Sequence, residues 1–327
     1  MSHPDRRRRT VQILLIILLA LITACVLVKA FFLRAPVQKT ELPSLPAQQA
    51  ETLPQDPETQ EKLRSHYERK PGFYTILVSG VDNGNGGSDT NLLVAADTEG
   101  GHVYGVSIPR DAKVEIGGKA RKLNYAYNLG GTEKLAEIVS AQLGIPVDYT
   151  VTVDLTGFTA LVNAIGGIDF YVPLDMDYDD PVQDLHIHVS KGSQHLDGET
   201  ALKVVRFRHN NDGTGYGSED IGRMATQQNF LRAVAKKMLS ASSLTKIDDY
   251  VRIFNRCVKT DLTAGNLAWL AGKVVEIGAE NVDFCTLPNH WKSPYVYLDA
   301  DEVLALVNER LNPYTEDRTE DDLHIPS

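Results

Sequence analysis

Nine consecutive residues constrain the fold of this chain more than any other segment. Phe73 to Val81 reads Phe-Tyr-Thr-Ile-Leu-Val-Ser-Gly-Val, an apolar run without regular polar alternation. Such a run is typical of a strand covered on both faces, as in sheets flanked by helices. A glycine-rich loop, Asp82 to Asp89, follows it at once. The run therefore predicts a central strand in a layered α/β protein.

Strand and helix patterns alternate through the rest of the chain, which favours an α/β fold. Two strand patterns, 90–96 and 103–108, flank a turn at Glu99–Gly101 and predict a hairpin. We therefore expect a mixed central β-sheet sandwiched by helices. Further strands are expected at 147–153, 168–172 and 282–287, and helices at 132–143, 154–165, 197–204, 219–239, 244–254, 264–277 and 299–311.

The N-terminus predicts a membrane anchor. Arg6 to Arg9 form a basic block, and residues 11–33 are an almost unbroken apolar run, long enough to be a transmembrane helix. The positive-inside rule then puts residues 1–10 in the cytoplasm and everything after the single-pass helix outside the cell membrane. A cleaved signal peptide is the alternative, although the run is long for one and no small-x-small site follows it cleanly.

The expected organisation outside the membrane has three parts. Residues 34–72 are expected to be an extracellular stalk, because repeated prolines interrupt a polar stretch rich in Gln and Glu. The folded domain is expected at 73–312, and the acidic tail at 313–327 is expected to fray. A formal net charge of −10 argues against nucleic acid as a partner.

Basic side chains gather around position 206 in this acidic protein. Arg206 and Arg208 alternate with Val205 and Phe207, so an extended backbone would place both guanidinium groups on one face. A second pair, Arg223 and Gln227, stands four residues apart and shares one face of the expected helix. Guanidinium groups bind phosphate through paired hydrogen bonds. The set predicts an oxyanion ligand, with surface salt bridges as the alternative.

Two aspartates, Asp82 and Asp89, stand at the ends of the glycine-rich loop. Loops at strand ends are where α/β proteins usually bind ligands. Mg²⁺ is commonly held by one or two carboxylates together with substrate phosphates. The two aspartates are therefore candidate metal ligands, and simple turn formation is the alternative.

A neighbouring expected strand ends in Arg110-Asp111, and Lys122 begins the segment that leads to a helix. These residues add charge at the same kind of strand end. An ordinary salt bridge is the alternative for Arg110 and Asp111, and a solvated lysine is the alternative for Lys122.

Two further patterns carry weaker signals. His186 and His188 would share one face of a strand, like a paired metal site, but no third ligand stands nearby at a recognisable spacing. The aspartates of the polar loop 173–192 lack the order of an EF-hand and are alternative partners for these histidines. Cys257 and Cys285 either form a disulfide or remain two buried thiols.

Together these residues resemble the LytR-CpsA-Psr family of cell-wall glycopolymer ligases, over roughly Phe73 to Leu239. So many matching pieces in one order make the resemblance specific. The pieces are Gly80-Val81-Asp82, Ser88-Asp89-Thr90, Ser107 to Asp111, Lys122 to Tyr127, Gly130-Gly131, Gly157-Phe158, Ile165 to Ile168, Met176-Asp177-Tyr178, His195 to Gly198, Val205 to His209, Asp220 to Arg223 and Gln227-Gln228.

The resemblance implies a metal-dependent phosphotransferase, of the polyisoprenyl-teichoic acid–peptidoglycan teichoic acid transferase type. Such proteins move a glycopolymer, such as wall teichoic acid or capsule, from undecaprenyl-pyrophosphate onto peptidoglycan as a phosphodiester. Their fold includes a hydrophobic tunnel for the lipid tail. A hydrolase that uses water as acceptor, and a non-catalytic prenyl-pyrophosphate-binding regulator of envelope assembly, stay open as alternatives.

The resemblance also implies roles for individual residues. Asp82 and Asp89 would hold Mg²⁺ or Mn²⁺, and Asp111 would orient Arg110 or act as a base beside it. One departure concerns Gly87, where the family often carries an arginine that contacts the pyrophosphate. The residues expected to bind the pyrophosphate are Arg110, Lys122, Arg206, Arg208, Arg223 and Gln227.

Overall fold

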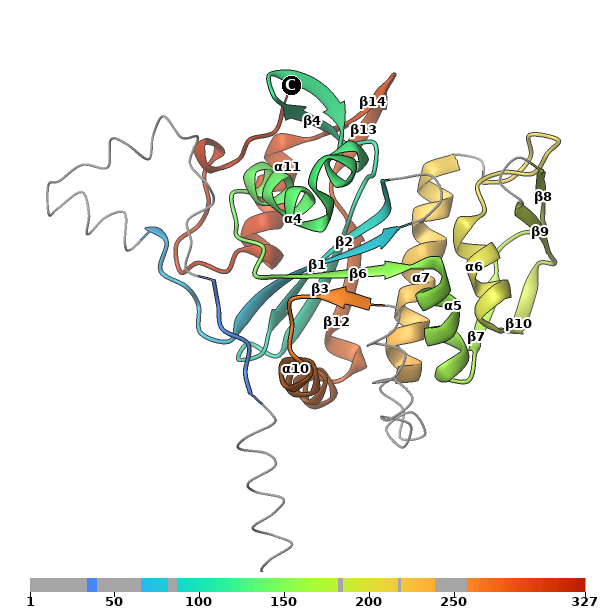
Figure 1. Ribbon diagram of the computed structural model, residues 1–327, viewed down its shortest axis with the longest axis horizontal. Coiled ribbons are helices and arrows are strands. Elements are labelled where there is room, and N and C mark those ends of the chain that lie inside the picture. Colours follow the sequence, from blue (N-terminus) through green and yellow to red (C-terminus); the bar gives the residue numbers. More distant parts are fainter. Residues whose placement is uncertain are drawn as a thin grey trace, which may run out of the picture.

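The centre of the molecule is a six-stranded mixed sheet between layers of helices (Figure 1). The computed structural model describes residues 34–39, 66–81, 87–181, 185–216, 219–238 and 258–326. The strand order is β11-β6-β1-β2-β3-β12, with β6 parallel to β1, β12 parallel to β3 and the other pairs antiparallel. The expected mixed α/β fold is therefore confirmed. The strands are β1 (Phe73–Val81), β2 (Ser88–Asp97), β3 (His102–Ile108), β6 (Tyr149–Asp154), β11 (Val258–Thr260) and β12 (Val282–Thr286).

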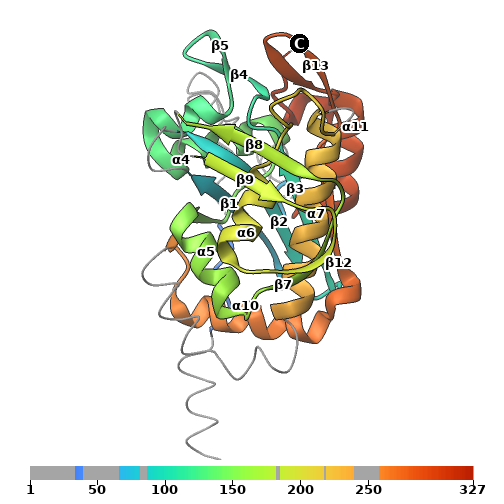
Figure 2. The ribbon, with the colours of Figure 1, turned by 90° about the vertical axis from the view of Figure 1, so that its right-hand side faces the viewer.

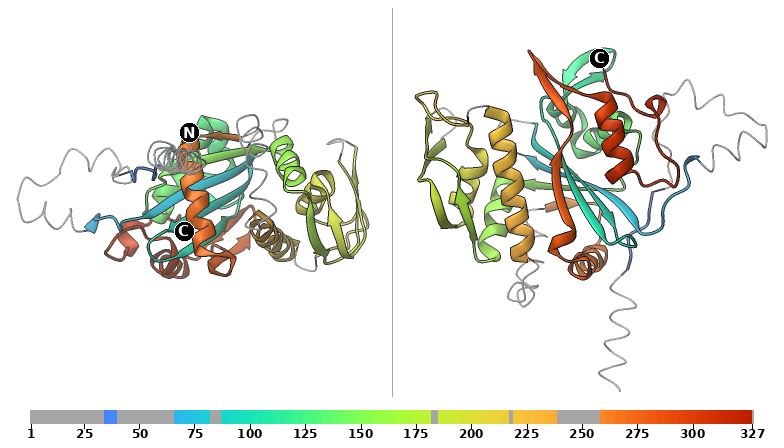
Figure 3. Two further views of the ribbon diagram at one scale, coloured as in Figure 1. Left: turned by 90° about the horizontal axis from the view of Figure 1, so that it is seen from below. Right: turned by 180° about the vertical axis from the view of Figure 1, so that it is seen from behind.

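Strand β1 is mostly apolar, and helices cover both of its faces. Leu77 points to one face and packs in a core with α4 (Asn124–Leu143) and α11 (Ala300–Leu306). Tyr74 and Ile76 point to the other face, where α10 (Ala264–Ile277) packs; the left view in Figure 3, from below, shows α10 across the sheet. Each side chain buried in this way contributes about 1.5–3 kcal/mol, which fixes the register of the central strand.

A second lobe lies beside the sheet and has its own core, which includes Phe170, Ile187, Phe207 and Phe230. Figure 2 looks onto this lobe, with β8 and β9 in front of α6 and α7. Its elements are α5 (Leu155–Ala164), β7 (Ile168–Val172), β8 (Met176–Asp180), β9 (Leu185–Val189), β10 (Gly192–Leu196), α6 (Gly198–Arg206) and α7 (Glu219–Met238).

The expectation of a polar loop at 173–192 is wrong. The segment forms two antiparallel strands, β8 and β9, that continue the pair β7–β10. Met176, Ile187 and Val189 are buried, and the residues between them are polar. This is the period of two expected for a half-buried strand. Aspartates and histidines on the outer face hid the pattern.

Two short hairpins flank the end of β3. They are β4 (Lys113–Ile116) with β5 (Lys119–Lys122), and β13 (Asn289–Lys292) with β14 (Tyr295–Leu298). Strand β14 is tied to the chain after β3 by the hydrogen bond that Val296 N donates to Asp111 O, 3.0 Å long. The remaining helical turns are Ala279–Asn281, a π-helical turn at Val307–Leu311, and Glu320–Asp322.

Segments on either side of the expected domain lie against it. Residues 34–39 and 66–72 contact the sheet, for example where Val37 N donates to the Tyr149 hydroxyl at 2.8 Å. The C-terminal segment is docked, so the expectation that it frays is wrong. Tyr314 and Arg318 are buried, and burial raises the pKa of Tyr314 to about 12.

Several expectations fall outside the described residues. The predicted transmembrane segment, 11–33, is one, and no helix within the described ranges is long and apolar enough to cross a bilayer. The others are residues 1–10, positions 40–65 of the expected stalk, Asp82, the expected helix at 244–254 and the Cys257–Cys285 bridge, since Cys257 is not described. Within the described residues, Cys285 has no disulfide partner.

The docked C-terminus makes an acid-sensitive contribution to stability. Burial alone raises the pKa of Asp322, but hydrogen bonds from His66 and Thr319 and the charge of Arg318 outweigh it and hold the pKa below 3.8. A carboxylate whose pKa is lowered by folding stabilises the protein above its unfolded pKa, and this contribution is lost as pH falls through the folded value.

We therefore expect Asp322→Asn to flatten the loss of stability on acidification. Urea unfolding midpoints between about pH 2 and pH 5 bracket the carboxylate titration and measure this slope. Asp321→Asn, at the exposed neighbouring position, is the control. A wild-type slope in Asp322→Asn would contradict the assignment.

Candidate oxyanion-binding site

A row of alternating charges crosses the end of the sheet where β3 stops. The Arg110 guanidinium contacts Asp89 through Nη1, and its Nε lies 3.7 Å from Asp111 Oδ1. The Lys122 ammonium lies 3.2 Å from the same Asp111 oxygen. Four of the residues proposed from the sequence are therefore in contact with one another.

Strand pairing explains why these residues meet. Antiparallel pairing of Asn91 with Ile108 places the beginning of β2 beside the end of β3, and so brings Asp89 to Arg110. The backbone after β3 is held on the other side, where Asn124 N donates to Arg110 O at 2.9 Å. Lys113 pairs with Lys122 across the β4–β5 hairpin, which returns Lys122 to Asp111.

The charge row is suited to exchanging partners with a ligand. Its side chains are partly exposed, and ion pairs of this kind contribute about 0–1 kcal/mol to stability. The Arg110 Nε is buried and has no hydrogen-bond acceptor within the described part of the chain, since Asp111 Oδ1 is 3.7 Å away. Asp111 contacts both cations, so its position is that of a group that orients them.

Helix α7 carries Arg223 toward the same end of the sheet. Arg232 donates to Phe284 O at 2.8 Å, and Gln228 donates to the Thr286 hydroxyl at 2.7 Å. The residue numbers run in opposite directions along α7 and β12, so the N-terminus of α7 points toward the end of β3. Five residues before Gln228 correspond to about 7.5 Å of helix.

Figures 1 and 3 agree with this direction, since both place the N-terminal end of α7 beside the end of β1 and the start of β2. Arg223 therefore lies at the same end of the sheet as Arg110. Side-chain hydrogen bonds from Gln228 and Arg232 to β12 hold the helix that carries Arg223 in place.

The segment that carries Arg206 and Arg208 is joined to α7 through Val205 and does not form a strand. The Gln227 side chain donates to Val205 O at 2.9 Å, which ties the end of α6 to α7. The expectation of an extended 205–208 segment is wrong for Arg206, because α6 begins at the Asp197 cap and continues through Arg206. Phe207 is extended and Arg208 is exposed.

The expected site residues thus fall into two groups, and contacts link the elements within each group. Asp89, Arg110, Asp111 and Lys122 form the charge row, and Arg206, Arg223 and Gln227 belong to the α6–α7 unit joined to β12. Asp82 lies outside the described residues. Gln227 already uses its amide N–H to join the two helices, so it positions the α6 end.

Two features of this region were missed by the sequence interpretation. Where β1 ends and β2 begins, the Ser79 and Ser88 hydroxyls and both polar atoms of the Asn91 side chain are buried and have no partner among the described residues. The exposed ring of Trp291 lies 6.0 Å from the Lys122 ammonium. In the sequence, these features could have been recognised from the polar residues within otherwise apolar strands and from the tryptophan between His290 and Lys292.

An α/β domain that gathers guanidinium and ammonium groups at one end of a mixed sheet has the charge pattern of a candidate oxyanion-binding site. This chain belongs to the LytR_cpsA_psr family, whose family model matches residues 45–317.

Curated relatives carry the name of one activity. The chain is 38% identical over 194 residues to the polyisoprenyl-teichoic acid–peptidoglycan teichoic acid transferase TagU of Bacillus cereus, with 58% of this chain and 60% of the relative covered. It is 36% identical over 204 residues to the corresponding transferase TagV of Bacillus subtilis, with 59% and 50% covered. The chain thus spans only about half to 60% of the relatives' length.

Solved structures share the fold. The crystal structure of Bacillus subtilis TagV has a TM-score of 0.62 at 30% identity, and the match covers 76% of this chain and all of that chain. That of Bacillus subtilis TagU has a TM-score of 0.54 at 26% identity, with 76% and 99% covered.

Proposed function

We propose that this protein is a membrane-anchored phosphotransferase that moves a glycopolymer from undecaprenyl-pyrophosphate to peptidoglycan outside the cell. The observation that carries the proposal is the charge row in which Arg110 contacts Asp89 and lies beside Asp111, with Lys122 next to it. The names of the curated relatives support the same activity.

In the proposed reaction, the acceptor hydroxyl oxygen attacks the phosphorus that carries the glycan. The P–O bond to the bridging oxygen breaks, and undecaprenyl phosphate leaves with the electron pair of that bond. The hydroxyl proton passes to solvent or to a carboxylate of the site. No ATP is consumed, because the pyrophosphate bond of the donor already supplies the driving force.

Arg110 has the central role in this proposal. Negative charge grows on the phosphate oxygens during transfer, and a guanidinium fixed in place stabilises that charge where it develops. A pyrophosphate oxygen would replace the Asp89 carboxylate on Arg110, while Asp111 keeps Arg110 and Lys122 oriented. Arg206, Arg208 and Arg223 would bind the remaining oxygens from the α6–α7 side.

The carboxylate of Asp89 suits a divalent cation of the Mg²⁺ or Mn²⁺ type. Asp89 is half-exposed at the start of β2, and among the described residues only its Oδ1 has a partner. Its other oxygen is the hard ligand that such ions prefer. Asp89, with Asp82, would hold the ion, which when bound neutralises charge on the pyrophosphate.

A place for the lipid tail is proposed on the sheet face opposite α4. Val78, Val94 and Val151 lie on that face and are only partly buried, on the side where α10 packs. An apolar strip that begins at the α10 core and runs along β1 and β2 toward Asp89 would accept an isoprenoid chain while its pyrophosphate reaches Arg110.

We expect the full-length protein to transfer a lipid-linked glycan to peptidoglycan, and we expect EDTA to stop the reaction. The assay incubates the protein in detergent micelles with both substrates, then measures glycan attached to the sedimented wall. Readdition of Mg²⁺ is the control and should restore transfer. Full activity in EDTA would refute the metal role.

The same assay separates the alternatives. Release of phosphate without attached glycan would indicate a hydrolase, and binding of the donor without turnover would indicate a regulator. Either result would overturn the proposed transfer.

A further inference from the structure

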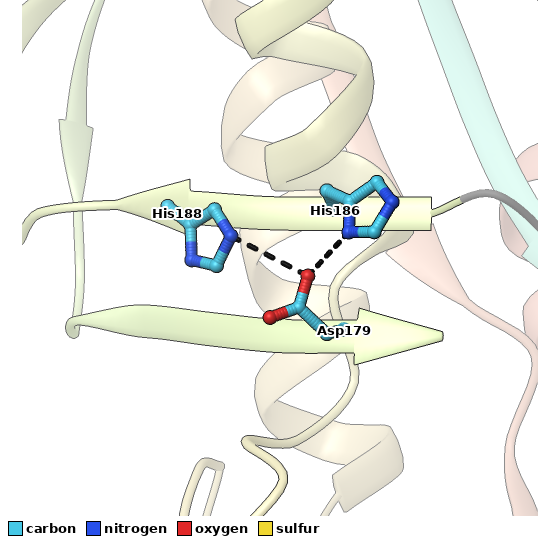
Figure 4. Close-up of side chains that lie close together, drawn as sticks. All are labelled: Asp179, His186 and His188. Carbon is cyan, nitrogen blue, oxygen red and sulfur yellow. Dashed lines mark hydrogen bonds and ion pairs between the residues drawn. The ribbon is translucent and has the colours of Figure 1, made fainter. Parts of the chain in front are cut away.

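The outer face of the β8–β9 hairpin carries two histidines opposite two aspartates. Antiparallel pairing puts Asp177 across from His188 and Asp179 across from His186. All four side chains are exposed, because Met176, Ile187 and Val189 take the inner positions. Figure 4 shows both imidazole rings turned toward the Asp179 carboxylate.

The ligand atoms of Asp179, His186 and His188 lie within 4.8 Å of one another. His186 Nδ1 contacts Asp179 Oδ1, and His188 Nε2 lies 3.4 Å from the same oxygen. Tetrahedral zinc with bonds of about 2.0–2.1 Å separates its ligand atoms by roughly 3.4 Å, so one contact already has the required length.

The second nitrogen of His188 is held as in a metal site. Its Nδ1 lies 2.6 Å from Asp177 Oδ1, close enough to donate an N–H to that carboxylate, and its Nε2 faces Asp179. Metal-bound histidines almost always have such a carboxylate or carbonyl behind them, because it fixes the ring and its tautomer.

The backbone beneath the aspartates is also fixed. Asp177 N donates to the Asn210 side chain at 2.7 Å, and Asp179 N donates to the Asn211 side chain at 2.6 Å. Asn211 returns a hydrogen bond to Asp179 O at 3.0 Å. The two asparagine side chains make the hydrogen bonds that a neighbouring strand would make. The backbone at Asp179 is therefore held by β9 on one side and by these amides on the other.

From this geometry we infer that Asp179, His186 and His188 bind a divalent transition-metal ion of the zinc type, with Asp177 orienting His188. Two imidazoles and one carboxylate suit such an ion, and a water completes four-coordination. The site is separate from the proposed phosphotransfer centre and links β8 to β9. The protein offers a matched comparison in the exposed cross-strand pair His195–Asp169, 2.7 Å apart, which contains only one histidine.

Cobalt titration of the full-length protein tests the inference. The protein is purified in detergent through a tag without histidine, and Co²⁺ binding is followed by its visible absorption, then by displacement with Zn²⁺. With excess Mg²⁺ present to occupy the proposed Asp82–Asp89 site, we expect one equivalent of Co²⁺ to bind. His186→Gln and Asp179→Asn should weaken binding by about tenfold or more, as loss of metal-site groups does elsewhere. His195→Gln should bind like the wild type.

Several results would overturn the inference. They are a wild-type protein that takes up no Co²⁺, variants at 179 and 186 that bind normally, and equal losses in His195→Gln and His186→Gln. Circular dichroism confirms that each variant is folded. Transfer activity is measured separately, so failure of the metal site leaves the proposed function unaffected.

Discussion

Replacing Arg110 with alanine is expected to lower glycan transfer by about 100- to 1,000-fold, the loss seen when one fixed donor is removed from a site of developing negative charge. The fold should be retained, because Arg110 is partly exposed and its ion pairs contribute little to stability. Initial rates of transfer and the thermal midpoint, measured on the same preparations, separate the two effects.

Arg110→Lys refines this prediction. Lysine keeps the positive charge but lacks the planar fork that binds two phosphate oxygens together. Its rate should therefore fall between those of the wild type and Arg110→Ala.

The matched control is Arg121→Ala on the adjacent hairpin. Its guanidinium packs over the Tyr125 ring, 5.5 Å from the centroid, outside the charge row. It removes one positive charge from the same neighbourhood and should leave transfer within about twofold, as expected of a surface residue that contacts no substrate. Normal turnover in Arg110→Ala would remove the basis of the proposed site.

Much of the sheet could be predicted because its strands are continuously apolar or bounded by glycine. Strand β1 occupies the range expected from its sequence, and α10 likewise. The helix before Gly144 ends there because that residue has a φ of 64°, a left-handed conformation that glycine adopts without strain. The residues within each of these elements are enough to determine where it begins and ends.

Elements whose burial depends on distant contacts could not be predicted. Strand β8 carries Met176 as its buried apolar residue, and only packing against β9 and α6 makes the remaining aspartates the outer face of a sheet. Likewise, Arg206 lies in a helix because the Asp197 cap and the buried Ala201 and Val204 extend it. The alternation of Arg206 and Arg208 with apolar residues instead indicates an extended backbone.

In the candidate site, too, some features could be predicted from local sequence and others depend on distant contacts. Position at strand ends predicted Asp89 and Arg110, which are in contact. No local pattern reveals that Lys122 reaches Asp111 through a hairpin, or that Trp291, about 170 residues along, lies beside Lys122; such contacts depend on the tertiary fold.

Asp148→Ala is expected to destabilise the domain by about 3–5 kcal/mol, the loss that follows when one partner of a buried ion pair is removed. Asp148 is fully buried and Arg69 is 7% exposed, with 2.8 Å between Oδ2 and Nη2. The carboxylate also accepts from Thr75 N at 2.9 Å and from Lys39 N at 3.0 Å. Its loss leaves the guanidinium charge without compensation inside the protein.

Urea unfolding measures this effect, with Asp169→Ala as the control. Asp169 is exposed and pairs with His195 on the surface, so its removal should change the free energy of unfolding by less than about 1 kcal/mol. A similarly small change in Asp148→Ala would show that the buried pair does not hold these segments together.

The double variant Arg69→Met with Asp148→Leu distinguishes the two parts of the effect. If the unpaired charge is the main cause, replacing both partners with apolar residues should recover most of the stability lost in Asp148→Ala. If the hydrogen bonds to Thr75 and Lys39 dominate, the double variant should remain as unstable as the single one, since both substitutions remove them. Either way, a domain that begins at Phe73 lacks Arg69, so the segment before the first strand belongs to the folding unit.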